Sequence, residues 1–252
     1  MTVEPGWPLA IALAALLVLG VGASYLGHLR QERGLVVAAI RAIIQLTAVS
    51  FIIVAALTHL VWACAFAALM FGVAVWTTSK RTGLGRAWPW AALAMASGAL
   101  PVLTIVFASG TAPLNGASVV PLAGIVIGNM MTVHTLLGRR TFAALRDNIP
   151  TYEAALSIGL VRPEAIREVT QPTIAEALLP TMDQTRTVGL VTLPGAFVGV
   201  LLGGGSPVQA GAAQVLVLVG IMAGQAVTTT VAHRLIREAR LLPPDLRARL
   251  RP

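Results

Sequence analysis

The chain has 252 residues, of which 56% are apolar and only 11% are charged. A soluble domain of this length does not need so much apolar surface, so we predict that the lipid bilayer is its solvent. The net charge of +8 would suggest a nucleic-acid partner in a soluble protein, but the placement of the basic residues excludes that interpretation.

Seven apolar stretches follow one another along the chain, each near the roughly 20 residues that cross a bilayer as a helix. The sixth is the shortest and contains Pro194 and several glycines, so a re-entrant loop is the alternative for it. The stretches cover 7–29, 35–57, 60–78, 87–108, 118–137, 188–202 and 208–231. We therefore predict an all-α, polytopic membrane protein with about seven transmembrane helices.

The basic residues fix the expected orientation. All but one of the 18 Lys and Arg residues lie in alternate connections, and the connections 58–59, 109–117 and 203–207 contain none. By the positive-inside rule the N-terminus is outside and the C-terminus inside, which requires seven crossings. The basic groups are Arg30 and Arg33; Lys80, Arg81 and Arg86; Arg139, Arg140, Arg146, Arg162, Arg167 and Arg186; and Arg234, Arg237, Arg240, Arg247, Arg249 and Arg251.

The first stretch has no basic segment before it and no small-residue cleavage site, so we expect a retained helix rather than a signal peptide. Cys64 is the only cysteine, which excludes an intrachain disulfide and a cysteine metal cluster. We expect a single transmembrane permease domain over 1–252, with a cytoplasmic insertion at 139–187 between the fifth and sixth stretches.

The insertion is too polar to cross a bilayer, and its apolar residues recur at helical spacing. Pro163 followed by Glu164 is typical of a helix start, so we predict a helix, a turn near Gly159–Pro163 and a second helix. An amphipathic helix lying on the membrane surface is the alternative.

The insertion opens with the pattern EAA-x3-G and continues to a Val and a Pro ten and thirteen residues after the glycine. This pattern resembles the EAA loop of ABC-transporter permeases, a cytoplasmic helix-turn-helix that docks on the ATPase subunit. The resemblance implies that six residues couple this chain to an ATPase: Glu153, Ala154, Ala155, Gly159, Val169 and Pro172.

Three further blocks narrow the resemblance: RAIIQL at 41–46, PLAGIVIGNMM at 121–131 and ALLPTMDQTRTVGLVTLPGAF at 177–197. They are similar to the FetB-type family of ABC permeases assigned to iron export, whose plant members are linked to aluminium tolerance. The resemblance implies a homodimeric permease with a separate ATP-binding subunit. The chain has no G-x-x-x-x-G-K-[ST] loop, so we expect it to bind no cofactor itself and to leave ATP and Mg²⁺ to that partner.

Polar groups within the stretches are costly and therefore need a reason. Asn129, Met130, Met131 and His134 form the best substrate-pathway candidate, because they offer nitrogen, oxygen and thioether ligands, with His134 as the one metal-ligand candidate. Helix–helix hydrogen bonds and core filling are the alternative. Gln214 is a further pathway candidate that could equally bridge helices.

Five residues are candidates for structural or gating roles. Arg41 and Gln45 share a helix face, and Arg41 either reaches the lipid headgroups or pairs with Asp183 or the loop backbone. Asp183 is expected to pair with Arg186 or Arg41, or to cap a helix beginning at Thr187. Pro194 and Gly195 are expected to kink or loosen the sixth span.

The leading hypothesis is an ABC permease subunit in the cell membrane that exports iron or a related metal ion and has no catalytic site of its own. An ABC permease for an organic substrate such as a nucleotide sugar is the main alternative, and the direction of transport stays open. A secondary transporter ranks lower because no Asp or Glu lies inside a span. An intramembrane enzyme is disfavoured because G-x-S-x-G and H-E-x-x-H are absent.

Overall fold

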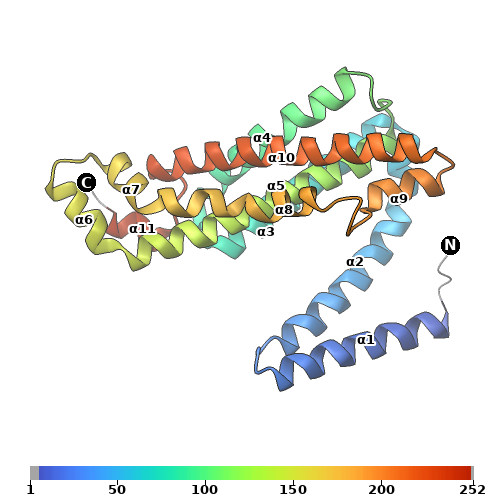
Figure 1. Cartoon of the computed structure of the whole chain (residues 1–252), viewed down its shortest axis with the longest axis horizontal. Helices are drawn as coiled ribbons and strands as arrows, with labels where there is room; N and C mark the ends of the chain where they lie inside the picture. The colour runs from blue at the N-terminus through green and yellow to red at the C-terminus, as the bar shows by residue number, and fades with distance from the viewer. Residues whose placement is uncertain (1–5, 251–252) are drawn as a thin grey trace. The chain divides into compact units, whose positions relative to one another are not determined.

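The computed structural model describes residues 6–250, so Arg251 of the basic tail lies outside the described residues. The chain is built from helices (Figure 1) and forms two compact units, one ending at Ala56 and the other beginning at Leu57.

The first unit is a hairpin of α1 (Trp7–Leu26) and α2 (Glu32–Thr58, whose last two residues fall in the second unit). Ser24 is buried at the turn, where its hydroxyl donates to Glu32 Oε1 at 2.9 Å and accepts from the Gln31 amide at 3.1 Å. These bonds tie the end of α1 to the start of α2.

The second unit is a bundle of α3 (Leu60–Thr82), α4 (Trp88–Ala108), α5 (Gly116–Asp147) and α10 (Pro207–Arg237). Within it α3 packs against α5, and α4 packs against both α5 and α10. A short 3₁₀ turn, η1 (Gly85–Ala87), joins α3 to α4.

Both long helices have side-chain caps at their starts. The Asn115 side chain accepts from the Ser118 amide before α5, and Ser206 with Gln209 forms a capping box before α10. Each cap satisfies amide groups that a helix start leaves without partners.

Six helices among the described residues are long and apolar enough to cross a membrane. They are α1 to α5 and α10, and their bounds follow six of the predicted stretches to within a few residues, except where α5 and α10 extend further at their C-termini. The prediction of a polytopic helical membrane protein is confirmed.

The sixth predicted span differs from expectation, because residues 188–202 do not form one helix. The chain instead forms α8 (Leu179–Arg186), a turn in which the Gly189 amide donates to the Thr192 carbonyl, and α9 (Gly195–Leu202). Asp183 lies inside α8, so the predicted helix start at Thr187 is wrong. Pro194 has no amide hydrogen and occupies the N-cap position of α9, which explains why the helix is broken rather than kinked.

The interrupted segment nevertheless runs from one end of the bundle to the other. Ala177, just before α8, belongs to the hydrophobic cluster at the end where α10 finishes, whereas α9 packs on α10 near its beginning. From Gln214, which contacts α9, to Ile236, in the cluster that contains Ala177, α10 spans about 33 Å at 1.5 Å per residue. The segment formed by α8, the turn and α9 therefore lies along α10 (Figure 1), in addition to the six helices that are long and apolar enough to cross a membrane.

The predicted insertion at 139–187 begins as a continuation of α5 and then forms α6 (Ile149–Ser157), α7 (Arg162–Ile174) and the 3₁₀ turn η2 (Ala175–Ala177). Gly159 joins α6 to α7 with a φ of +96°, which side-chain-bearing residues rarely adopt. The predicted helix-turn-helix is present. The chain ends in α11 (Pro244–Arg249).

Candidate functional site

A buried polar cluster lies between α3 and α5. The Thr78 hydroxyl shares a hydrogen bond of 2.9 Å with His134 Nδ1. The Thr135 hydroxyl lies 2.8 Å from Thr78 Oγ1, within hydrogen-bond distance. Thr78 is wholly buried and His134 is 2% exposed. The threonines therefore hold the imidazole ring at a fixed orientation inside the bundle.

His134 keeps one ring nitrogen unused, because Nε2 is buried without a hydrogen-bond partner among the described residues. The single hydrogen of the Thr135 hydroxyl has two acceptors within reach, Thr78 Oγ1 at 2.8 Å and the Met131 carbonyl oxygen at 2.7 Å. Nδ1 accepts from Thr78 in the first arrangement, which puts the ring hydrogen on Nε2, and donates to Thr78 in the second, which leaves the lone pair on Nε2. A buried polar nitrogen without a partner costs free energy unless a ligand or water meets it. Nε2 is thus a buried polar atom of this cluster whose hydrogen-bonding capacity is unused in the described structure.

The other predicted pathway residues on α5 face different neighbours. Met130 is wholly buried and accepts from the Thr228 hydroxyl of α10 at 3.1 Å, beside Gly98 of α4. Asn129 donates from its side chain to the Ile125 carbonyl of its own helix, at 2.9 Å. The structure therefore brings Met130 to the α4–α10 contact rather than to His134.

A second polar group lies where α5 meets α10. The Gln225 side chain donates from Nε2 to the Asn129 carbonyl at 3.4 Å, and its Oε1 is buried without a hydrogen-bond partner in the described part of the chain. Met131 is half-buried and packs against the cluster between α3, α4 and α5. Asn129 and His134 are thus separate points along α5, each with one buried polar atom nearby that lacks a partner.

Gln214 has a different position from the one expected of a pathway residue. It is buried in the first half of α10, and its Oε1 accepts from the backbone amide of Phe197 at 3.2 Å. Phe197 lies in the first turn of α9, whose amides have no partners within the helix. The side chain of one helix therefore caps another.

No group of three or more His, Cys, Asp or Glu side chains arranged to hold a metal ion occurs among residues 6–250. Cys64 is exposed on α3. His134 is therefore a single potential ligand whose immediate neighbours are hydroxyl groups.

The predicted coupling residues divide into two sets on the α6–α7 hairpin. Ala155 and Val169 are buried against the bundle. The other four present an outward face: Glu153, Ala154, Gly159 and Pro172 are exposed. The motif thus supplies both an attachment to the bundle and a free surface.

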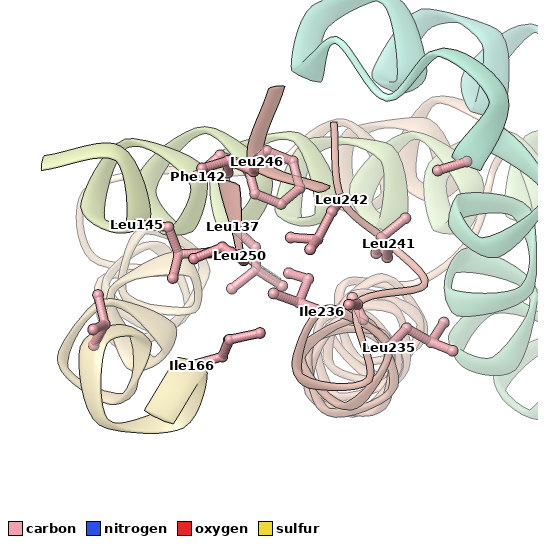
Figure 2. Packing of buried hydrophobic residues seen from close by; sticks show 14 of the residues in the cluster. Leu137, Phe142, Leu145, Ile166, Leu235, Ile236, Leu241, Leu242, Leu246 and Leu250 are labelled. Carbon is pink, nitrogen blue, oxygen red and sulfur yellow. The ribbon is translucent and has the colours of Figure 1, made fainter. Parts of the chain in front are cut away.

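The hairpin is attached to the bundle by an apolar core at the end of the bundle where α10 finishes (Figure 2). Ile166 of α7 is fully buried in this core together with Ile236 of α10. Figure 2 shows side chains of α5, α7, α10 and the C-terminal segment converging there: Leu137, Phe142, Leu145, Ile166, Leu235, Ile236, Leu241, Leu242, Leu246 and Leu250.

Polar contacts add to this attachment. The Thr170 hydroxyl of α7 lies 3.0 Å from His233 Nε2 of α10, and Arg237 Nε donates to the Pro163 carbonyl at 3.2 Å. Arg140 of α5 pairs with Glu176 in η2. Burial raises the pKa of Tyr152 in α6. The charge and hydrogen bond of Arg162 act in the opposite direction and offset only part of this rise.

Helix α11 packs against α5 at the end of the bundle where α10 finishes. Arg146 donates from Nε to Asp245 Oδ2 at 2.7 Å and from its terminal nitrogen to Oδ1 at 3.1 Å. The hydrogen bond from Arg146 lowers the pKa of Asp245. The sequence analysis missed this helix, although Pro244 followed by Asp245 is a typical helix start.

Four of the five candidate gating residues are exposed, and Pro194 is half-buried. Asp183 accepts from Arg186 at 3.0 Å within α8, as one of the expected pairings proposed. Arg41 and Gln45 are exposed one turn apart on α2. Pro194 and Gly195 mark the junction between the turn and α9.

Several residues of the polar clusters were not found from the sequence. They are threonines, Thr78, Thr135 and Thr228, which the search for nitrogen and thioether ligands passed over. Their signal was available, since a hydroxyl inside an apolar span must meet a partner.

Comparison with known proteins gives a consistent result. The model of the uncharacterised protein family UPF0014 matches residues 7–240. The chain is similar to the probable iron export permease protein FetB of Escherichia coli (30% identical; 89% of this chain, 87% of the relative). It also resembles rice UPF0014 membrane protein STAR2 (28%; 88% and 79%) and Arabidopsis protein ALUMINUM SENSITIVE 3 (27%; 91% and 83%). No solved structure matches the chain.

Proposed function

Since this chain belongs to the uncharacterised protein family UPF0014, we propose that it is the membrane-spanning permease subunit of an ATP-binding cassette transporter. The observation that carries the proposal is the α6–α7 hairpin, whose outward face bears Glu153, Ala154 and Gly159. The hairpin is anchored by buried side chains to the ends of α5 and α10.

In this proposal two copies of the chain assemble with two ATPase subunits, which bind ATP and Mg²⁺ and close on nucleotide binding. Each ATPase receives the exposed face of one hairpin. Because α7 packs against both α5 and α10, a displacement of the hairpin moves these two spans together.

We propose iron or a related metal ion as the exported substrate. The probable iron export permease FetB is among the relatives, and His134 Nε2 supports the idea as a buried nitrogen open to a ligand. One imidazole and neighbouring hydroxyl groups suit a weak, transient contact rather than tight storage. An organic substrate such as a nucleotide sugar is the alternative that the same hydroxyl and amide groups could bind.

The experiment is co-purification of the chain with the candidate ATPase, followed by ATP hydrolysis in liposomes with and without ferrous iron. We expect a stable complex and iron-stimulated hydrolysis. Glu153→Arg should reduce both ATPase binding and stimulation at least tenfold, because it reverses a charge on the docking face. Asp147→Arg, an equal charge reversal at the exposed end of α5, is the matched control and should change neither.

The outcomes separate the parts of the proposal. A complex that forms but responds only to an organic substrate would remove the metal and keep the permease. Transport by the chain alone, without any ATPase, would contradict the permease assignment.

A further inference from the structure

A groove of about 530 Å³ lies on the surface of the α3–α4 hairpin. Its walls are mainly apolar and aromatic, with Phe71 and Trp76 from α3 and Trp88 from α4. Trp76 and Trp88 are 64% and 55% exposed, so their rings border the groove without being buried by other parts of the second unit.

One end of the groove is polar and positively charged. Lys80 lies over the Trp76 ring, with Nζ 5.2 Å from the ring centroid. Ser79 also lines the groove, is 8% exposed, and has a hydroxyl without a hydrogen-bond partner in the described structure. A cation and an unsatisfied hydroxyl beside an apolar slot match an amphiphile with an anionic head.

The groove lies at the level of the cytoplasmic headgroups. Lys80 and Arg81 occupy the last turn of α3, immediately before the connection that contains Arg86. Tryptophan and lysine side chains at a span end are typical of the membrane interface. The cytoplasmic leaflet is also where anionic lipids attract basic residues.

We propose that this groove is a binding site for one anionic phospholipid. The phosphate group contacts the Lys80 ammonium and the Ser79 hydroxyl, and an acyl chain lies against Phe71, Trp76 and Trp88. A second copy of the chain fits this face less well, because a two-fold contact centred here would bring two ammonium groups together.

The proposed lipid site and the Thr78–His134 cluster share one turn of α3. Ser79 directly follows Thr78, the partner of His134, and the Thr82 hydroxyl donates to the Thr78 carbonyl at 2.7 Å. A lipid bound to Ser79 and Lys80 would therefore stabilise the turn of α3 that orients His134.

The test uses the full-length protein and native mass spectrometry in detergent, with phosphatidylglycerol and phosphatidylcholine of identical acyl chains. We expect one phosphatidylglycerol to be retained in preference to phosphatidylcholine. Lys80→Gln should lower that preference about fivefold, because one basic side chain contributes roughly this much near an anionic surface. Ser79→Ala should weaken retention in the same direction.

The matched control is Arg81→Gln, which removes one charge from the adjacent exposed position outside the groove. It should leave the preference within twofold of the unmodified protein. Equal losses in Lys80→Gln and Arg81→Gln would show general attraction to an anionic surface and overturn the site.

Lys80 is the only lysine in the chain, so acylation of the Lys80 peptide gives an independent measurement. Phosphatidylglycerol should protect the amine more than phosphatidylcholine does. If protection of the amine rises with protein concentration and does not depend on the lipid, the groove is a contact between copies of the chain. That result would overturn the proposal. Protection by free inorganic phosphate equal to that by the lipid would identify a phosphate site without an acyl-chain contact and would also overturn it.

Discussion

Thr78 of α3 and His134 of α5, 56 positions apart in the chain, share a buried hydrogen bond of 2.9 Å in the interior of the bundle. The bond fixes Nδ1 of the His134 ring and leaves Nε2 without a hydrogen-bond partner in the described structure. The packing of α3 against α5 thus depends on a polar contact as well as an apolar one.

Replacing Thr78 with Val tests this contact. The substitution keeps the shape and removes the hydroxyl, so Nδ1 loses its partner at a cost of about 1–3 kcal/mol. Thermal unfolding in detergent should show a lower Tm for Thr78→Val, and iron-stimulated hydrolysis should fall. Thr78→Ser retains the hydroxyl and should restore both. A Val variant with unchanged Tm would contradict the importance of the bond.

The crossing of α4 and α10 depends on Gly98. A Cβ atom at Gly98 would lie 2.1 Å from Thr228 Oγ1 and 2.3 Å from the Gly224 carbonyl oxygen, which is backbone and cannot move aside. We expect Gly98→Ala to destabilise the bundle by about 1–3 kcal/mol or more, measured as a loss of Tm.

Gly128→Ala is the matched control for that measurement. No heavy atom beyond its own helix backbone and chain neighbours lies within 4 Å of a Cβ at Gly128 in the described structure. Alanine also favours a helix over glycine by up to about 1 kcal/mol, so the control should be neutral or stabilising. Equal destabilisation by both variants would show that helix backbone changes, not close packing, are responsible.

The anchoring of the α6–α7 hairpin can be tested with two isoleucines. Ile166 is fully buried in the core of Figure 2, whereas Ile158 at the end of α6 is 79% exposed. Ile166→Ala should cost about 2–5 kcal/mol and increase hydrogen exchange across α6 and α7. Stimulated ATP hydrolysis should fall as well. Ile158→Ala should leave exchange in α7 unchanged, and the reverse ranking would place the anchor elsewhere.

The contact between α5 and α11 should depend on pH. Because Arg146 lowers the folded-state pKa of Asp245, the ion pair stabilises the docked helix above the ordinary Asp pKa of about 3.9. That stabilisation is lost as the pH falls through the lower, folded-state value. Both side chains are partly exposed, so the effect should be only about 0.2–1 kcal/mol.

The measurement is Tm against pH for the unmodified protein, Asp245→Asn, Arg146→Gln and the double variant. We expect a gap between the unmodified protein and each single variant at neutral pH that closes in acid. The double variant should lose little beyond either single one. Additive losses would mean that the two residues act separately.

Most of the spans could be predicted because apolar length and basic flanks are local properties. The position of the arginines predicted seven crossings, whereas six helices of the described residues are long and apolar enough to cross, and residues 188–202 are not one helix. The break there reflects Pro194, whose missing amide favours a helix start over a helix interior. Composition indicated a weak span but not where its helix would begin.

The arrangement of the candidate site was less predictable. His134 and Met130 are one helical turn apart on α5, yet they contact α3 and α10 respectively. Which neighbour each side chain meets depends on how the helices pack, and one sequence does not specify this. The division of the coupling motif into buried Ala155 and exposed Glu153 has the same origin.

The turn between α8 and α9 can gain order in only one direction. Growth of α9 towards its N-terminus stops within about one residue, because Pro194 cannot donate to a preceding carbonyl and disfavours a helical Leu193. Growth of α8 towards its C-terminus meets no proline until that same position, but it requires Gly189 to leave its left-handed conformation, with a φ of +81°. Coiling there would shorten each residue from about 3.3 Å to 1.5 Å. The turn can therefore be absorbed into α8, which would shorten the segment, but not into α9.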